Sequence, residues 1–180
     1  MVPLKYWFLR LCRRATPKTL INFMLDRGIY LKPGGETSRP QEVAALYLEC
    51  MARNGLNLKG SAVCVVGYGG SYGIGIHLLA AGASRVILQD PYAPPKRWRN
   101  RQIPAELMAR YFRQEKGQWI PDSDKLVLRH EELSLYAERN PESVDFVVSR
   151  STFEHVSNVQ GLVTPCWQVL RPGGARNPHY

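Results

Sequence analysis

Residues 63–90 have the sequence VCVVGYGGSYGIGIHLLAAGASRVILQD. They pass from an apolar segment, Val63 to Val66, through a glycine-rich turn and an apolar helical pattern to a second apolar segment, Val86 to Leu88. Continuous runs of β-branched residues are typical of parallel strands that are covered on both faces. We therefore predict two parallel strands joined by a crossover helix, a unit that commonly binds nucleotide-like ligands.

The turn between these strands contains five glycines within nine positions. Glycine adopts positive φ angles easily and lets a ligand approach the backbone closely, because it has no Cβ. Free amide groups at the start of the following helix would favour an anionic ligand group. Asp90 comes 23 residues after Gly67, where an acid at the end of the second strand can meet a ribose diol. The alternative is a glycine turn that only lets the helix pack closely on the strand.

Further strand and helix patterns alternate along the rest of the chain. The sequence predicts a helix over 104–115, a third strand over 125–129, a short helix over 133–139 and a fourth strand over 144–149. Such alternation predicts an α/β fold with a mostly parallel sheet between helical layers. Residues 1–60 predict helices over 16–28 and 38–54 with a loop at 31–37. We therefore divide the chain into an N-terminal helical extension, 1–60, and an α/β domain, 61–180.

Composition places the chain among cytoplasmic globular proteins. Its 180 residues are 44% hydrophobic, enough for one domain with a substantial core. The opening segment MVPLKYWFLRLCRR is interrupted by Lys5 and Arg10, so we expect neither a signal peptide nor a membrane span. The cysteines lack C-x-x-C spacing and the histidines are scattered, which argues against a disulfide framework and against a metal site; the cysteines are Cys12, Cys50, Cys64 and Cys166.

The net charge of +9 is concentrated toward the N-terminus. Residues 1–60 contain ten Lys and Arg against four acids, whereas residues 61–180 contain fourteen against eleven. A second basic cluster follows the second strand and consists of Lys96, Arg97, Arg99 and Arg101 around Trp98. These charges could steer an acidic substrate or contact an anionic surface, although a solvated loop would look the same. No pattern of a nucleic-acid-reading module accompanies them.

Three segments together resemble the class I S-adenosylmethionine-dependent methyltransferases, in the group that acts mainly on small molecules and lipids. They are VVGYGGSYGIG at 65–75 with the downstream Asp90, DFVVSRSTFEHV at 145–156, and WQVLRPGG at 167–174. The resemblance implies a Rossmann-like three-layer sandwich with strand order 3-2-1-4. It also implies S-adenosylmethionine as the cofactor and a small-molecule, sugar or lipid acceptor.

The resemblance also assigns roles to individual residues. The turn Gly67, Tyr68, Gly69 would lie against the methionine portion of the cofactor, and Asp90 would accept hydrogen bonds from its ribose. Glu131 or Glu132 would lie near the adenine, and Ser149 and Arg150 would border the point of methyl delivery. Methyl transfer from a sulfonium depends mainly on positioning. For a hydroxyl acceptor His155 is the candidate general base, with a helix-start or packing role as its alternative.

The sequence departs from the family pattern in three places. Val65 stands where members usually have an acid, and Ser71 replaces the third glycine of the motif. The usual seven-stranded sheet continues beyond the RPGG turn, whereas this sequence stops at Tyr180. A four-stranded sheet would leave residues 144–148 as an unpaired apolar edge open to self-association, unless the chain is a fragment or something covers that edge.

Two other functions fit the same residues. A nicotinamide-dependent oxidoreductase would use the glycine turn and Asp90 equally well. A non-catalytic, methyltransferase-like protein would explain the loss of the acid at Val65.

Overall fold

The computed structural model describes residues 38–93, 100, 103–116, 118–150, 152–153, 156 and 158–179, with the backbone alone at 174–179. The predicted helix over 16–28, the loop at 31–37 and the whole basic cluster around Trp98 lie outside the described residues. Residues from Gly34 onward form one compact unit. Within the described part of the chain, no helix is both long enough and apolar enough to span a bilayer.

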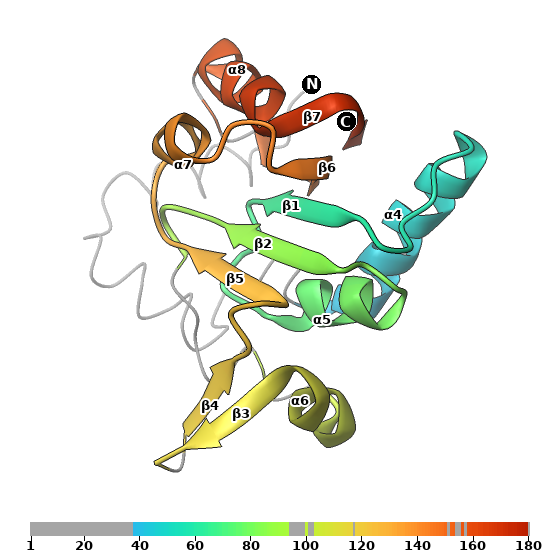
Figure 1. The fold of residues 1–180 in the computed structure, drawn as a ribbon, viewed down its shortest axis with the longest axis vertical. Helices are drawn as coiled ribbons and strands as arrows, with labels where there is room; N and C mark the ends of the chain where they lie inside the picture. Colours follow the sequence, from blue (N-terminus) through green and yellow to red (C-terminus); the bar gives the residue numbers. More distant parts are fainter. Residues whose placement is uncertain are drawn as a thin grey trace, which may run out of the picture. The chain divides into compact units, whose positions relative to one another are not determined.

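A parallel sheet forms the centre of this unit (Figure 1). Its order is β5-β2-β1-β6-β7, and every neighbouring pair is parallel. The strands are β1 (Ala62–Val66), β2 (Arg85–Gln89), β5 (Leu126–Arg129), β6 (Val144–Arg150) and β7 (Leu170–His179). The first four reproduce the predicted order 3-2-1-4, so the α/β, Rossmann-like fold is confirmed.

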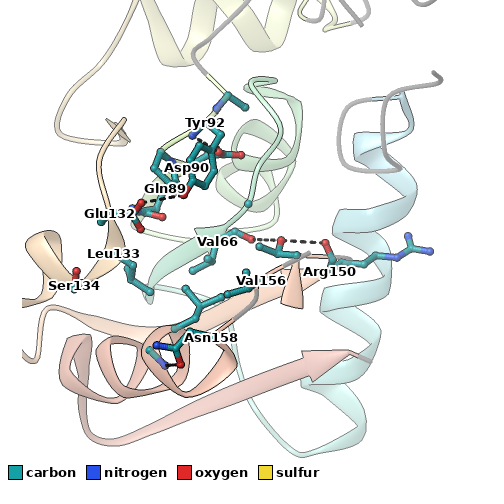
Figure 2. Close-up of a pocket in the computed structure, with 16 residues that line it drawn as sticks. Val66, Gln89, Asp90, Tyr92, Glu132, Leu133, Ser134, Arg150, Val156 and Asn158 are labelled. Atoms are coloured by element: carbon teal, nitrogen blue, oxygen red, sulfur yellow. Dashed lines mark hydrogen bonds between the residues drawn. The ribbon is translucent and has the colours of Figure 1, made fainter. Parts of the chain in front are cut away.

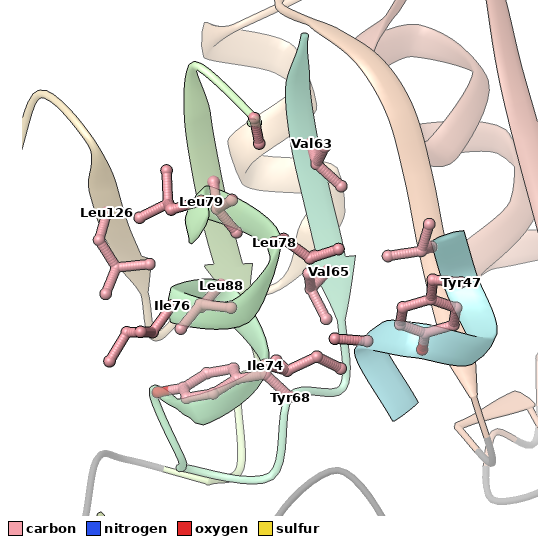
Figure 3. Close-up of a cluster of buried hydrophobic side chains, with 14 of the residues drawn as sticks. Tyr47, Val63, Val65, Tyr68, Ile74, Ile76, Leu78, Leu79, Leu88 and Leu126 are labelled. Carbon is pink, nitrogen blue, oxygen red and sulfur yellow. The ribbon is translucent and has the colours of Figure 1, made fainter. Parts of the chain in front are cut away.

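Helices cover both faces of the sheet, which makes three layers. One face packs against α4 (Pro40–Arg53) and α5 (Gly73–Ala80), and the other packs against α7 (Leu133–Arg139) and α8 (Val159–Val169). Successive side chains of β1 enter opposite layers, Val63 and Val65 on the α5 side (Figure 3) and Cys64 and Val66 on the α7 side. This alternation follows from the two-residue period of a strand and explains why the whole segment is apolar.

The helix α4 packs against the sheet domain. Its buried side chains Val43, Ala44, Tyr47 and Met51 lie at helical spacing and join the same core cluster as α5. Gly73 at the start of α5 allows close packing, because a Cβ there would come within 2.6 Å of the Pro40 ring. The predicted division of the chain at residue 60 stays a prediction, but α4 contributes directly to the core of the sheet domain.

A small antiparallel hairpin replaces the last third of the helix predicted over 104–115. The helix α6 (Ala105–Tyr111) is followed by β3 (Phe112–Glu115) and β4 (Gln118–Pro121). Phe112 has an extended backbone and buries its ring in the core, with its centroid 5.1 Å from that of Tyr72. This tertiary contact overrides the helical preference of the residues that follow, and the chain reverses at Lys116, where φ is +48°.

The fifth strand, β7, corrects the prediction of an exposed edge at residues 144–148. It runs parallel to β6, with Val144 opposite Leu170 and Phe146 opposite Ala175. The irregularity between these pairs coincides with Gly173, whose φ is +83°. β6 is therefore paired on both sides, by β1 and β7, so the alternative that something covers its edge is the one that the structure bears out. The sheet also has one strand more than the sequence predicted.

Candidate functional site

A cavity of about 640 Å³ opens where the parallel strands end. This size is within the range usual for small-ligand sites, and the carboxyl edge of a parallel sheet is where such ligands bind. Figure 2 shows its walls, which come from the ends of β1, β2 and β6 and from the starts of α7 and α8. The lining residues are Val66, Gly67, Gln89, Asp90, Pro91, Tyr92, Ala93, Glu132, Leu133, Ser134, Arg150, Thr152, Val156, Asn158, Gly161 and Leu162.

The glycine turn is required by backbone conformation and by one close contact. Gly67, Gly69 and Gly70 have φ angles of +78°, +69° and +77°, a region that other residues rarely adopt. A Cβ on Gly67 would also lie 2.0 Å from Oγ1 of Thr152. The Thr152 hydroxyl donates to the Val66 carbonyl at 3.2 Å, so the end of β6 is held against the turn. The space beside Gly67 is therefore filled by Thr152.

The first amides of α5 are hydrogen-bonded within the chain. The amide of Tyr72 donates to Oδ1 of Asn100 at 2.7 Å, and the amide of Gly73 donates to Oγ of Ser71 at 3.2 Å. Ser71 is fully buried and stands where a third glycine was expected. The expectation that these amides are free for an anionic ligand group is therefore wrong for these two, because the fold supplies its own acceptors.

Asp90 lies in the cavity wall directly after β2 and is 8% exposed. Its Oδ2 accepts from the amide of Gly69 at 3.2 Å, and its Oδ1 accepts from the amides of Tyr92 and Ala93 at 2.9 and 3.0 Å. The carboxylate thus fastens the glycine turn to the loop that follows β2. An ionised carboxylate has about four acceptor positions, so these three bonds leave about one for a ligand.

A second acid, Glu132, faces the cavity from the loop before α7. Its Oε1 accepts from the hydroxyl of Tyr92 at 3.2 Å, which connects the loop after β2 to the start of α7 (Figure 2). The negative charge of Glu132 and this hydrogen bond raise the pKa of Tyr92 above its usual value of 10. Two acids that come from separate strand ends therefore line one cavity.

Comparison with known proteins identifies the family. A family model described as a methyltransferase domain matches residues 68–176, more than half of the chain. The chain belongs to this methyltransferase family. Proteins of the family typically take their methyl group from S-adenosylmethionine, so the class predicted from the sequence is confirmed.

Solved structures also resemble this methyltransferase. One is a protein from Pyrococcus horikoshii that is provisionally named an RNA methyltransferase; it has 16% sequence identity and a TM-score of 0.45. The match covers 71% of this chain and 53% of that protein, so this chain spans about half the length of its structural neighbour. No curated protein matches the sequence significantly.

The described cavity fits the cofactor of a methyltransferase. It has the volume of a small-ligand site, an acid with one acceptor position left at the end of β2, and a second acid at the start of α7. A nucleoside needs such acceptors for its hydroxyl and amino groups. The apolar side chains of Leu133, Val156 and Leu162 lie in the same wall and could pack on a base.

The structure brings half of the described predicted site residues of the methyltransferase together in the cavity wall. Gly67, Asp90, Glu132 and Arg150 all line the cavity. The Arg150 side chain, however, extends away from the other labelled residues in Figure 2. Gly69 reaches the site through its amide bond to Asp90. These residues come from four separate segments, as expected for the carboxyl edge of one sheet.

Besides Gly69, three other predicted residues lie outside the cavity wall. Tyr68 is 1% exposed and packs in the core on the α5 side (Figure 3). Glu131 forms an ion pair with Arg139. Ser149 is buried, and its hydroxyl donates to the Val66 carbonyl at 3.0 Å, so it braces β6 against β1.

The departure at Val65 also has a structural cause. Val65 is fully buried in the apolar core beside Tyr68 and Ile74, so an acid at this position would be enclosed by hydrocarbon. The methyltransferase therefore uses this position for packing.

Sequence reasoning missed several residues of the cavity. Gln89 and Tyr92 flank Asp90, and Thr152 and Asn158 follow β6. Gln89 offered a signal, since it is a polar residue at the end of an otherwise apolar strand. The candidate base His155 lies outside the described residues, so its role stays a prediction. Among the described residues there is no group of three or more side chains suited to hold a metal ion.

Proposed function

We propose that this methyltransferase binds S-adenosylmethionine in the cavity at the carboxyl edge of the sheet and methylates a small-molecule, sugar or lipid acceptor. The observation that supports the proposal most is the convergence of Gly67, Asp90 and Glu132 on one cavity of about 640 Å³. When bound, S-adenosylmethionine supplies a methyl group on a sulfonium, a leaving group that needs no further activation.

The protein's contribution is binding and orientation. Asp90 is held rigid by three amides and keeps about one acceptor position for a ribose hydroxyl. Glu132 keeps its second carboxylate oxygen for a donor on the base. Such fixed contacts place a reactive group in the geometry of attack, which is the main source of acceleration in a displacement.

The acceptor is expected at the end of β6. Thr152 lines the cavity there and is fixed by its bond to the Val66 carbonyl. Three residues further on, His155 is our proposed general base for a hydroxyl acceptor, because a neutral imidazole takes a proton near pH 7. The net charge of +9 would draw acidic acceptors or anionic surfaces toward the protein.

Calorimetric titration with S-adenosylhomocysteine tests the cofactor assignment. We expect the wild type to bind this product and not to bind NADH or NADPH. Asp90→Asn should weaken binding about tenfold, because it removes one charge-assisted acceptor from the site. The matched control is Asp124→Asn, a change in an exposed turn before β5. Binding of a reduced nicotinamide without S-adenosylhomocysteine would overturn the proposal in favour of an oxidoreductase.

Label transfer tests the acceptor class. The protein is incubated with methyl-labelled S-adenosylmethionine and a cell extract, which is then divided into small-molecule, lipid and RNA fractions. Label in the small-molecule or lipid fraction supports the proposal. Label that is found only in RNA, and that ribonuclease releases, would overturn the acceptor class while leaving the cofactor assignment intact.

A further inference from the structure

Gln89 is a buried polar side chain that the proposed function does not yet use. It is the last residue of β2, lies beside Val66 of β1 and is 1% exposed. Removing an amide from water is unfavourable unless its polar atoms find partners. Both the nitrogen and the oxygen of the Gln89 amide therefore need a hydrogen-bond partner, either from the protein or from a ligand in the cavity that the residue lines.

One end of the amide has a partner within the chain. The Nε2 group of Gln89 donates to the backbone carbonyl of Glu131. Because a carbonyl only accepts hydrogen bonds, the nitrogen must face Glu131, and the orientation of the amide is settled. Oε1 therefore points away from Glu131.

The other end of the amide is open to a ligand. No described residue donates a hydrogen bond to Oε1 of Gln89, and neighbouring protein atoms do not seal this oxygen off. Gln89 lines the cavity and is 1% exposed, and the small part of it that stays accessible includes this oxygen, so we place Oε1 at the cavity surface. A neutral acceptor in this position suits a hydroxyl donor.

Asp90 alone is not sufficient for a vicinal diol. Its three bonds to backbone amides leave about one acceptor position, whereas a diol presents two donors. We propose that Oε1 of Gln89 accepts a hydrogen bond from one ribose hydroxyl of the bound adenosyl ligand, while Asp90 accepts from the other. Gln89 is then a specificity-determining residue for ribose in this methyltransferase. The inference rests on the proposed function, because it presumes an adenosyl ligand.

Ligand analogues test the inference on the wild type. S-adenosylhomocysteine is compared by calorimetry with its 2′-deoxy and 3′-deoxy analogues. Each analogue should bind about tenfold more weakly, because each leaves one buried acceptor without a donor. Equal affinity for all three ligands would overturn the role of Gln89 and leave the cofactor site standing. If S-adenosylhomocysteine itself did not bind, the proposed function would fail, and this inference with it.

The variant Gln89→Met assigns the hydroxyl to its acceptor. Methionine keeps the length and flexibility of the side chain but lacks the acceptor. The variant should bind S-adenosylhomocysteine about tenfold more weakly and should no longer discriminate against one of the two deoxy analogues. The control Gln114→Met makes the same change on the exposed strand β3 and should bind all three ligands as the wild type does.

A purely structural role for Gln89 has a different signature. If its bond to Glu131 only shaped the cavity, Gln89→Met would weaken all three ligands by the same factor and keep the full discrimination of the wild type. That outcome would overturn the inference. If the variant fails to fold, the comparison on the wild type still tests the inference, since equal affinity for the three ligands would overturn it.

Discussion

Replacing Gly67 by alanine tests the packing of the turn beneath the cavity. Gly67 has a φ of +78°, and an added Cβ would meet the Thr152 side chain, 2.0 Å from Oγ1 and 2.9 Å from both Cβ and Cγ2. Thr152 cannot simply rotate away without losing its hydrogen bond to the Val66 carbonyl. The substitution therefore has two separate costs, an unfavourable backbone conformation at residue 67 and a steric clash with the Thr152 side chain.

The expected cost is the sum of these two effects. A left-handed conformation costs an alanine about 1 to 2 kcal/mol relative to glycine. Overfilling a packed site costs about 1 to 3 kcal/mol more. Gly67→Ala should therefore lower the free energy of unfolding by about 2 to 5 kcal/mol.

Gly60 supplies the matched control. Its φ of +79° is almost the same as that of Gly67, but no atom lies within 4 Å of its would-be Cβ. Gly60→Ala should cost only the conformational part, about 1 to 2 kcal/mol. Urea denaturation of both variants measures the difference, which we expect to be about 1 to 3 kcal/mol.

A second substitution separates the two contributions at Gly67. Thr152→Ala removes Oγ1 and Cγ2, so in the double variant Gly67→Ala, Thr152→Ala the clash should be relieved by about 1 to 2 kcal/mol, while the strain remains. The reasoning would be refuted if Gly67→Ala cost no more than Gly60→Ala, or if the two changes were additive.

Three further predictions concern other contacts. The half-exposed Arg171 donates to both carboxylate oxygens of Asp145 at 2.7 and 2.8 Å. Arg171→Met should therefore lower the free energy of unfolding by about 0.5 to 1 kcal/mol, and by less in 1 M NaCl, because salt screens the ion pair. Equal losses at low and high salt in urea denaturation would contradict this prediction. The Tyr92 hydroxyl should titrate in ultraviolet absorbance above pH 10, and Glu132→Gln should move its pKa back down. Because the folded-state pKa is the raised one, the stability from this contact is complete below about pH 10 and is lost as pH rises through the folded-state pKa; an unchanged titration in the variant would exclude the contact. His155→Gln should lower kcat about 10²-fold for a hydroxyl acceptor and leave the affinity for S-adenosylhomocysteine unchanged, as measured by label transfer and calorimetry; an unaltered kcat would remove His155 as the base.

Local patterns in the sequence were sufficient to locate four strands of the parallel sheet, whereas their order was an implication of the family resemblance. The segments around Val63, Val86, Leu126 and Val144 are predominantly apolar, as a doubly covered strand requires, and the strands appear where these patterns lie. Asp90 was also predictable, because a short apolar strand brings the residue after it to the carboxyl edge of the sheet. Both predictions depend on residues that are neighbours in the sequence.

Errors arose where a distant partner decides the conformation. The residues after Tyr111 favour a helix locally, yet burial of the Phe112 ring near Tyr72 makes them extended. The sequence pattern also does not show that the large ring of Trp167 is 63% exposed, which follows because α8 turns Cys166 and Val169 toward the sheet. The strand β7 likewise forms only because β6 offers an open edge.

The sequence by itself determined an α/β fold, because strand and helix periods and a glycine turn between two apolar strands are local properties, and its three motif segments supplied the resemblance to methyltransferases. Only the tertiary structure decided which polar groups remain for a ligand. The amides at the start of α5 already donate hydrogen bonds to Asn100 and Ser71. Backbone amides likewise use most of the acceptor positions of the Asp90 carboxylate. The free oxygen of Gln89 emerges only once Glu131, 42 residues away in the sequence, has accepted its amide. A hydrogen bond is satisfied or open according to what the fold brings within about 3 Å, and the linear order of residues does not contain that distance.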